Sequence, residues 1–126
     1  AFVKGIADST GAVAAPLEPS APRTVCDEKT AKVLRSMLVS VVTEGIGAEA
    51  RPAAGMAGGK TGTAQTGQYD ENGEELLNYW FSGFYPAQAP RYTVTVLQDG
   101  ILKPALSSAA IFEKITEILH VWDAAL

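Results

Sequence analysis

Apolar residues recur at helical spacing in two stretches of the chain. The first begins near Glu28, with Asp27 or Thr24 as the capping residue, and ends at Gly45 and Gly47. Its apolar positions are Ala31, Leu34, Met37 or Leu38, Val41 and Val42. The second lies near the end of the chain, and its apolar face comprises Ile111, Ile115, Ile118, Leu119 and Trp122. The pattern therefore predicts two amphipathic helices.

Alternating residue types and runs of β-branched or aromatic residues predict five strands. Two of them, over residues 2–7 and 12–17, flank the turn Asp8-Ser9-Thr10-Gly11. The other three contain residues 60–65, 78–85 and 92–97, and Asp99-Gly100 closes the last one. Residues 69–75 are polar and acidic, so we expect a long solvated loop there.

The order of these elements predicts the fold class. Three consecutive strands with short or medium connections form an antiparallel sheet, and the apolar helix faces are expected to cover one face of it. The fold class is therefore α+β. The length of 126 residues suits one small domain, and the hydrophobic content of 47% is that of a globular chain.

Charge and composition exclude several kinds of function. The net charge of −4 comes without a basic cluster, so nucleic acid is not an expected partner. Cys26 has no neighbouring histidine to activate it, and His120 has no second ligand to share a metal, so no cofactor is predicted. The chain opens at Ala1 without an initiator methionine, and we expect a piece of a longer protein.

The stretch with the most chemistry is Ala57-Gly58-Gly59-Lys60-Thr61-Gly62-Thr63-Ala64-Gln65. Its glycines allow close approach of a ligand, and its hydroxyls, backbone N–H groups and single ammonium suit an anionic, carbonyl-bearing molecule. A phosphate-binding P-loop would need glycine at position 54, where Ala54 stands, so we reject that alternative.

The residues Lys60-Thr61-Gly62-Thr63-Ala64-Gln65 resemble the Lys-Thr-Gly motif of the class B penicillin-binding proteins. The flanks resemble the same family: residues 41–47 look like the helix end before the motif, and 80–86 like the next strand. The resemblance implies a partial penicillin-binding transpeptidase fold, similar to serine β-lactamases. It also implies a D,D-transpeptidase that crosslinks peptidoglycan stem peptides through an acyl-serine and binds β-lactams.

The resemblance assigns roles to the motif residues. Lys60 and Thr63 are the expected catalytic residues: Lys60 supplies positive charge beside the nucleophile, and the Thr63 N–H is an oxyanion-hole donor. Thr61, Gly62, Thr63 and Gln65 are the expected substrate-binding residues, with both threonine hydroxyls on the substrate carboxylate. Strand alternation places Lys60 and Thr61 on opposite faces, so these roles require the strand to twist at an edge.

The chain departs from the family in one respect. No serine is followed by lysine three positions later or by asparagine two positions later, so the nucleophile motif Ser-x-x-Lys and its Ser-x-Asn partner are absent from the sequence. We therefore expect residues 1–126 to be the C-terminal portion of a transpeptidase domain that is inactive alone. Its expected partners are the N-terminal portion of that domain, the peptidoglycan stem peptide and β-lactam antibiotics.

The resemblance also implies a location at the extracytoplasmic face of the bacterial membrane, with an N-terminal anchor in the parent protein. Exposed strand edges suggest that the isolated chain self-associates. Two alternatives stay open: a non-catalytic binding or interaction module, and a β-lactam sensor or β-lactamase of the same superfamily.

Overall fold

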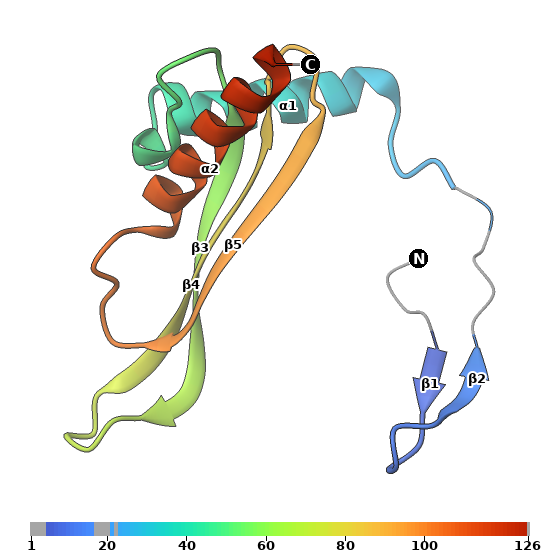
Figure 1. Ribbon diagram of the computed structural model, residues 1–126, viewed down its shortest axis with the longest axis vertical. Coiled ribbons are helices and arrows are strands. Elements are labelled where there is room, and N and C mark those ends of the chain that lie inside the picture. The colour runs from blue at the N-terminus through green and yellow to red at the C-terminus, as the bar shows by residue number, and fades with distance from the viewer. Residues whose placement is uncertain (1–4, 17–20, 22, 126) are drawn as a thin grey trace.

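A computed structural model describes residues 5–16, 21 and 23–125. Its first element is a small hairpin of β1 (Gly5–Ala7) and β2 (Val13–Pro16), which stands apart from the other elements in Figure 1. The Asp8 carboxylate accepts hydrogen bonds from the Thr10 N–H, the Thr10 hydroxyl and the Ala12 N–H, and this forms the turn. The predicted hairpin is confirmed for these residues, while residues 2–4 and 17 lie outside the described part.

The main body is an antiparallel sheet in the order β3-β4-β5, formed by β3 (Gly58–Tyr69), β4 (Glu75–Tyr85) and β5 (Tyr92–Ile101). The predicted antiparallel sheet of three consecutive strands is therefore confirmed. The strands are longer than predicted, and the expected loop over residues 69–75 is a tight turn. The Asp70 carboxylate closes this turn by accepting bonds from the backbone N–H groups of Asn72 and Glu74.

The last strand also continues beyond its predicted end. Gly100 has a φ of +60°, and its N–H donates to the Asn78 side-chain oxygen at 2.8 Å. The pairing between β4 and β5 shifts register between Leu77 and Tyr79. A side chain thus takes the place of a strand partner, and the strand continues through the glycine to Ile101.

Both helices are capped by side chains. In α1 (Glu28–Thr43) the Asp27 carboxylate accepts a bond from the Thr30 N–H at 2.6 Å, so Asp27 rather than Thr24 is the cap. In α2 (Ser108–Ala124) the Ser107 hydroxyl accepts from the Ala110 N–H at 3.0 Å. The bond from Thr30 also holds the pKa of the Asp27 carboxyl below its ordinary value, because it stabilises the ionised form.

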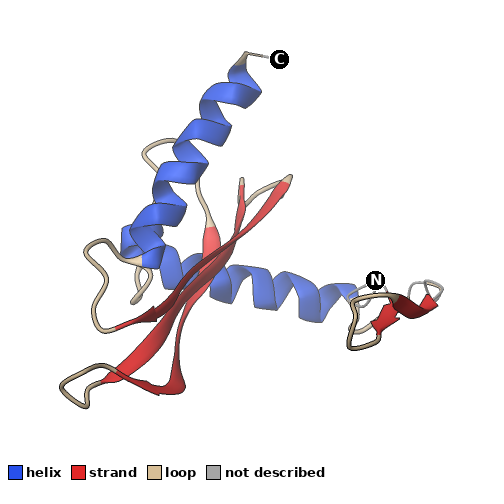
Figure 2. Ribbon diagram, turned by 60° about the horizontal axis from the view of Figure 1, so that its bottom comes forward, coloured by secondary structure: helices blue, strands red, loops and turns tan. Residues whose placement is uncertain are grey.

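The two helices lie on opposite sides of the sheet, as Figure 2 shows. Phe112 of α2 packs on Phe81 of β4, with ring centroids 4.7 Å apart. Phe84 points to the other face, because side chains alternate along a strand, and there it lines a groove with Leu34 and Leu38 of α1. The expectation that both helices cover one face is therefore wrong.

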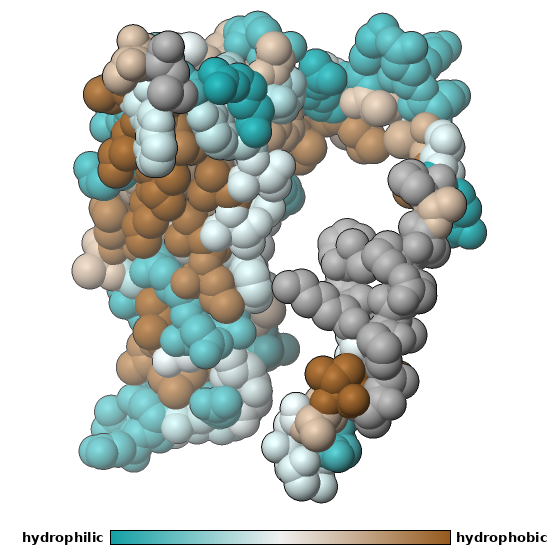
Figure 3. Space-filling model, turned by 45° about the vertical axis from the view of Figure 1, so that its right-hand side comes forward, coloured by the Kyte–Doolittle hydropathy of each residue, from teal (hydrophilic) through white to brown (hydrophobic). Residues whose placement is uncertain are grey.

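The buried face of α2 also differs from the predicted one. Phe112 and Thr116 are fully buried, whereas Ile118 and Trp122 of the predicted apolar face are 66% and 61% exposed. Ile111 and Ile115 are partly buried at the margin of the core. The core consists of Val42, Ala50, Ala57, Phe81, Tyr85, Val96, Ala109 and Phe112. Figure 3 shows that apolar side chains also form a continuous area on the surface of the main body.

Candidate functional site

The candidate motif begins immediately after a buried pair of glycines in β3. A Cβ atom at Gly58 would lie 2.4 Å from the Phe84 ring, and one at Gly59 would lie 2.6 Å from the Phe81 ring. Phe84 and Phe81 lie on opposite faces of the sheet. The start of β3 is therefore held between two aromatic rings, and no side chain fits at either position.

The following residues of β3 form an open strand edge. Within the described residues β3 pairs with β4 alone, so its second edge has no strand partner. Lys60, Thr63 and Gln65 are exposed, and Thr61 and Gly62 are half-buried. The strand thus passes from a packed core to an accessible edge within two residues, and unpaired backbone groups become available to a ligand.

Lys60 and Thr61 point to opposite faces but meet at this edge. The Lys60 ammonium donates to the Thr61 carbonyl oxygen at 2.8 Å and to the Thr61 hydroxyl at 3.2 Å. Because β4 occupies the other edge of β3, the ammonium approaches this carbonyl from the open side. The N–H and C=O of one residue point the same way in an antiparallel strand, and the direction repeats every second residue. The N–H of Thr63 therefore points to the open edge as well.

A cavity of about 180 Å³ adjoins the threonine side of the edge. Thr61, Gly62 and Thr63 line it together with the 3-10 helix η1 (Ala48–Ala50) and the start of α2. The Glu49 carboxylate accepts a hydrogen bond from the Ser107 hydroxyl at this junction. A larger hollow, of about 540 Å³, runs along α1 and contains none of the motif residues.

Gln65 is tied to the neighbouring strand. Its side-chain amide donates to the Glu75 carboxylate at 2.8 Å, and the Gly67 N–H donates to the same carboxylate at 3.1 Å. Sequence reasoning placed Glu75 in a solvated loop and missed this contact. It also missed Phe81 and Phe84 as the clamp on the glycine pair. The strand register, in which Phe84 is opposite Gly58 and Phe81 is opposite Thr61, is what brings these rings to the glycines.

Comparison with known proteins adds to this geometry. A family model described as the penicillin binding protein transpeptidase domain matches residues 1–117. The chain belongs to the penicillin-binding protein transpeptidase family. It is 43% identical over 84 residues to Stage V sporulation protein D of Bacillus subtilis, and this match covers 64% of this chain and 12% of that protein. It is 32% identical over 137 residues to Penicillin-binding protein PbpB of Mycolicibacterium smegmatis, covering 94% of this chain and 20% of that protein.

Solved structures of penicillin-binding transpeptidases have the same fold. Penicillin binding protein 3 of Mycobacterium tuberculosis in its apo form matches with a TM-score of 0.68 and 27% identity, over 96% of this chain and 30% of that one. A D,D-transpeptidase domain of a peptidoglycan glycosyltransferase from Eggerthella lenta matches with a TM-score of 0.62 and 25% identity. This match covers 94% of the present chain and 27% of that one. The predicted resemblance and the partial α+β transpeptidase fold are therefore confirmed.

This chain spans a fifth or less of the length of the curated relatives named above. In the described part of the chain, no helix has the length and apolar content that crossing a membrane requires. Nor do the described residues contain a cluster of three or more side chains suited to hold a metal ion.

Proposed function

We propose that this chain supplies the Lys-Thr-Gly strand of a peptidoglycan D,D-transpeptidase. In the proposed reaction, a serine hydroxyl attacks the carbonyl carbon of the penultimate D-alanine of a stem peptide. The terminal D-alanine leaves, and an acyl-serine ester forms. An amine of a neighbouring stem peptide then attacks the ester, which completes the crosslink and restores the serine. β-Lactams acylate the same serine.

The open edge of β3 carries this proposal. Its Thr63 N–H points toward the side from which a ligand approaches, as an oxyanion-hole donor must, and such a donor is typically worth about 3 kcal/mol of transition-state stabilisation. The Lys60 ammonium lies at the same edge, hydrogen-bonded to Thr61. It would stabilise negative charge that develops near the nucleophile.

The remaining motif residues would bind the substrate. The hydroxyls of Thr61 and Thr63 share one face of the strand and adjoin the same cavity, so both can reach one carboxylate. Gly62 leaves room between them, because it has no side chain. Gln65 would line the same groove, where the Glu75 carboxylate orients its amide.

The nucleophile and its lysine base would come from the N-terminal portion of the same transpeptidase domain, of which residues 1–126 would be the C-terminal portion. Stem peptides and β-lactams would be the ligands. A structure of Penicillin binding protein 3 from Mycobacterium tuberculosis is complexed with ampicillin, which supports the β-lactam part of the proposal. The parent protein would act at the extracytoplasmic face of the membrane.

A labelling experiment with a fluorescent penicillin tests the proposal. The isolated chain should give no covalent band on a denaturing gel, whereas the chain joined to its own N-terminal portion should give one that excess unlabelled penicillin abolishes. A stable adduct on the isolated chain would contradict the proposal. Absence of label on the joined protein would indicate a non-catalytic module, and rapid release of the label would indicate a β-lactamase.

A further inference from the structure

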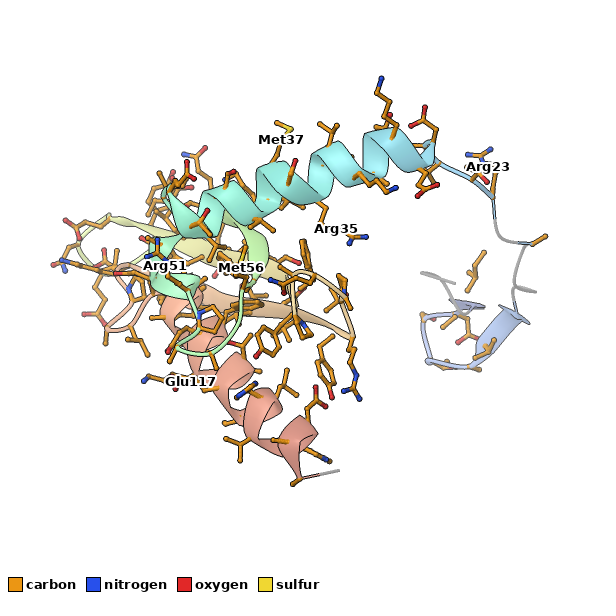
Figure 4. All side chains as sticks on the ribbon, turned by 90° about the horizontal axis from the view of Figure 1, so that it is seen from above. Arg23, Arg35, Met37, Arg51, Met56 and Glu117 are labelled. Carbon is orange, nitrogen blue, oxygen red and sulfur yellow. The ribbon has the colours of Figure 1, made fainter. Side chains whose placement is uncertain are left out.

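The loop of residues 51–57 leads directly into β3 and determines where the strand begins. Figure 4 shows Arg51 and Met56 on this loop, between α1 on one side of the sheet and α2 on the other. The Arg51 guanidinium donates to the Thr43 carbonyl at the end of α1. The Met56 carbonyl accepts a bond from the Ala87 N–H at 2.7 Å. One end of the loop is therefore attached to the end of α1, and the other to the connection between β4 and β5.

Tyr85 holds the middle of the loop. Its hydroxyl donates to the Ala54 carbonyl at 3.0 Å, and the residue is only 2% exposed. Gly55 follows with a φ of +78°, and a Cβ atom there would lie 3.3 Å from the Tyr85 hydroxyl oxygen. The left-handed glycine thus brings the loop backbone against the tyrosine ring, which leaves the hydroxyl in contact with the carbonyl.

His120 of α2 completes this arrangement. Its Nδ1 lies 3.0 Å from the Tyr85 hydroxyl oxygen, at the same time as the hydroxyl faces the Ala54 carbonyl. A hydroxyl has one hydrogen, and a carbonyl can only accept, so the hydroxyl hydrogen belongs to the Ala54 contact. The geometry therefore assigns a hydrogen to Nδ1 of His120, which donates to Tyr85.

We propose that Tyr85 and His120 are positioning residues for the strand that carries Lys60 and Thr63. In the described part of the chain, neither side chain forms a hydrogen bond with residues 60–65. They act through the Ala54 carbonyl, six residues before Lys60. This inference rests on the proposed transpeptidase function, because it gives the loop contact a role in catalysis.

The open edge explains why such positioning matters. A central strand has strand partners on both sides, whereas β3 pairs with β4 alone within the described residues. Its position therefore also depends on α1, which packs on it, and on its entry loop. An oxyanion-hole donor must lie within a few tenths of an ångström of its productive position, and a displacement of about 1 Å can cost about a hundredfold in rate. Loosening of the loop would displace the Thr63 N–H along the strand direction.

The test uses the complete transpeptidase that contains this chain. Tyr85→Phe removes the hydroxyl and keeps the ring on Gly55. We expect the second-order rate of acylation by a fluorescent penicillin to fall about tenfold. We also expect backbone hydrogen exchange, measured by mass spectrometry, to accelerate several-fold in peptides that cover residues 51–63. Peptides from β5 should be unchanged.

Tyr92→Phe is the matched control. The Tyr92 hydroxyl donates to Asp123 at 2.6 Å, and Asp123 lies on α2, as His120 does. This hydrogen bond does not involve the loop of residues 51–57. A general loosening of α2 would affect both variants equally, whereas positioning affects Tyr85→Phe alone. Two variants test His120. His120→Asn keeps an N–H donor at a similar distance from the backbone and should preserve the acylation rate. His120→Leu removes the donor and should reproduce the Tyr85→Phe defect.

Three outcomes would overturn the inference: unchanged exchange in Tyr85→Phe, an equal defect in Tyr92→Phe, or faster exchange without slower acylation. The proposed function fails by a different result, which is an unchanged acylation rate in Lys60→Ala. The two failures are therefore distinguishable in one set of proteins.

Discussion

The two ends of the motif stretch in β3 differ in almost every physical respect. Gly58 and Gly59 are buried between aromatic rings on the two faces of the sheet, and a side chain at either position would collide. Lys60 follows Gly59 directly and Thr63 lies four residues after it; both are exposed, and the strand edge has no strand partner in the described part. The same strand thus contains a rigid anchor and an accessible edge.

This difference separates stability from function along the chain. Changes in the anchor should unfold the protein, because its close packing cannot relax without moving backbone. Changes at the edge should affect ligands and leave the fold intact, because exposed side chains make few packing contacts. The following predictions rest on the proposed function and test this separation in the longer protein that would contain this chain.

The largest effect is expected at Lys60. Lys60→Ala should lower the second-order rate of acylation by penicillin about a hundredfold, because it removes a positive charge where negative charge develops. The melting temperature should stay close to that of the parent, since the side chain is exposed and its hydrogen bonds are to Thr61 alone. Equal acylation rates in variant and parent would refute the role of Lys60.

The next effect concerns the anchor. Gly59→Ala places a methyl group 2.6 Å from the Phe81 ring and 2.8 Å from the Ser82 carbonyl, and should destabilise the fold by about 3 kcal/mol in urea denaturation. Gly62→Ala is the control on the same strand. Its methyl group meets only Trp80, at 3.4 Å, so it should change stability by less than about 1 kcal/mol. Similar losses in both variants would contradict the proposed division of the strand.

A smaller effect separates the hydroxyl of Thr63 from its backbone N–H. Thr63→Ser keeps both groups and should acylate like the parent. Thr63→Val keeps the N–H and the shape but loses the hydroxyl, which should cost about 1–3 kcal/mol of carboxylate recognition. The measurement is the acylation rate of each variant. If serine and valine lower it equally, the shape of the side chain matters rather than its hydroxyl.

The smallest effect is a loss of folding stability at alkaline pH, and we expect it to come from Tyr85 and not from Lys60. Burial, and then the charge of Asp123, raises the pKa of the Tyr85 hydroxyl above its ordinary value of 10.0. The folded state therefore binds this proton more tightly than the unfolded state. The stabilisation that the Tyr85 hydroxyl contributes is fully present below pH 10. It declines as the pH rises through the raised pKa of the folded state.

Thermal melts at increasing pH above 9 measure this decline. Tyr85→Phe should flatten the fall in melting temperature, whereas Lys60→Ala should leave it unchanged. A parent melting temperature that does not depend on pH in this range would contradict the prediction.

Self-association of the isolated chain follows from the open edge of β3 and the exposed apolar residues of α2, Ile118 and Trp122. This expectation stays a prediction. Light scattering decides it, and a single monomeric species at micromolar concentration would show that the chain is self-sufficient.

The sequence by itself determined the elements and the motif. Helical spacing and a capping residue at Asp27 or Thr24 predicted α1, and the strand patterns predicted the antiparallel sheet, because these signals act between residues close in the chain. Lys60-Thr61-Gly62 and its flanks indicated the penicillin-binding family, since the chemistry of the motif is carried by residue types and spacing.

Only the tertiary structure decided which faces are buried and which edge is open. The apolar residues of α2 form a stripe wider than the area that the sheet covers, so periodicity could not select Phe112 and Thr116 over Ile118 and Trp122. Helical spacing likewise could not say that the helices lie on opposite sides of the sheet. The hydrogen bond between Tyr85 and Ala54 joins residues 31 positions apart, and such contacts arise from the packing of whole elements rather than from local preference.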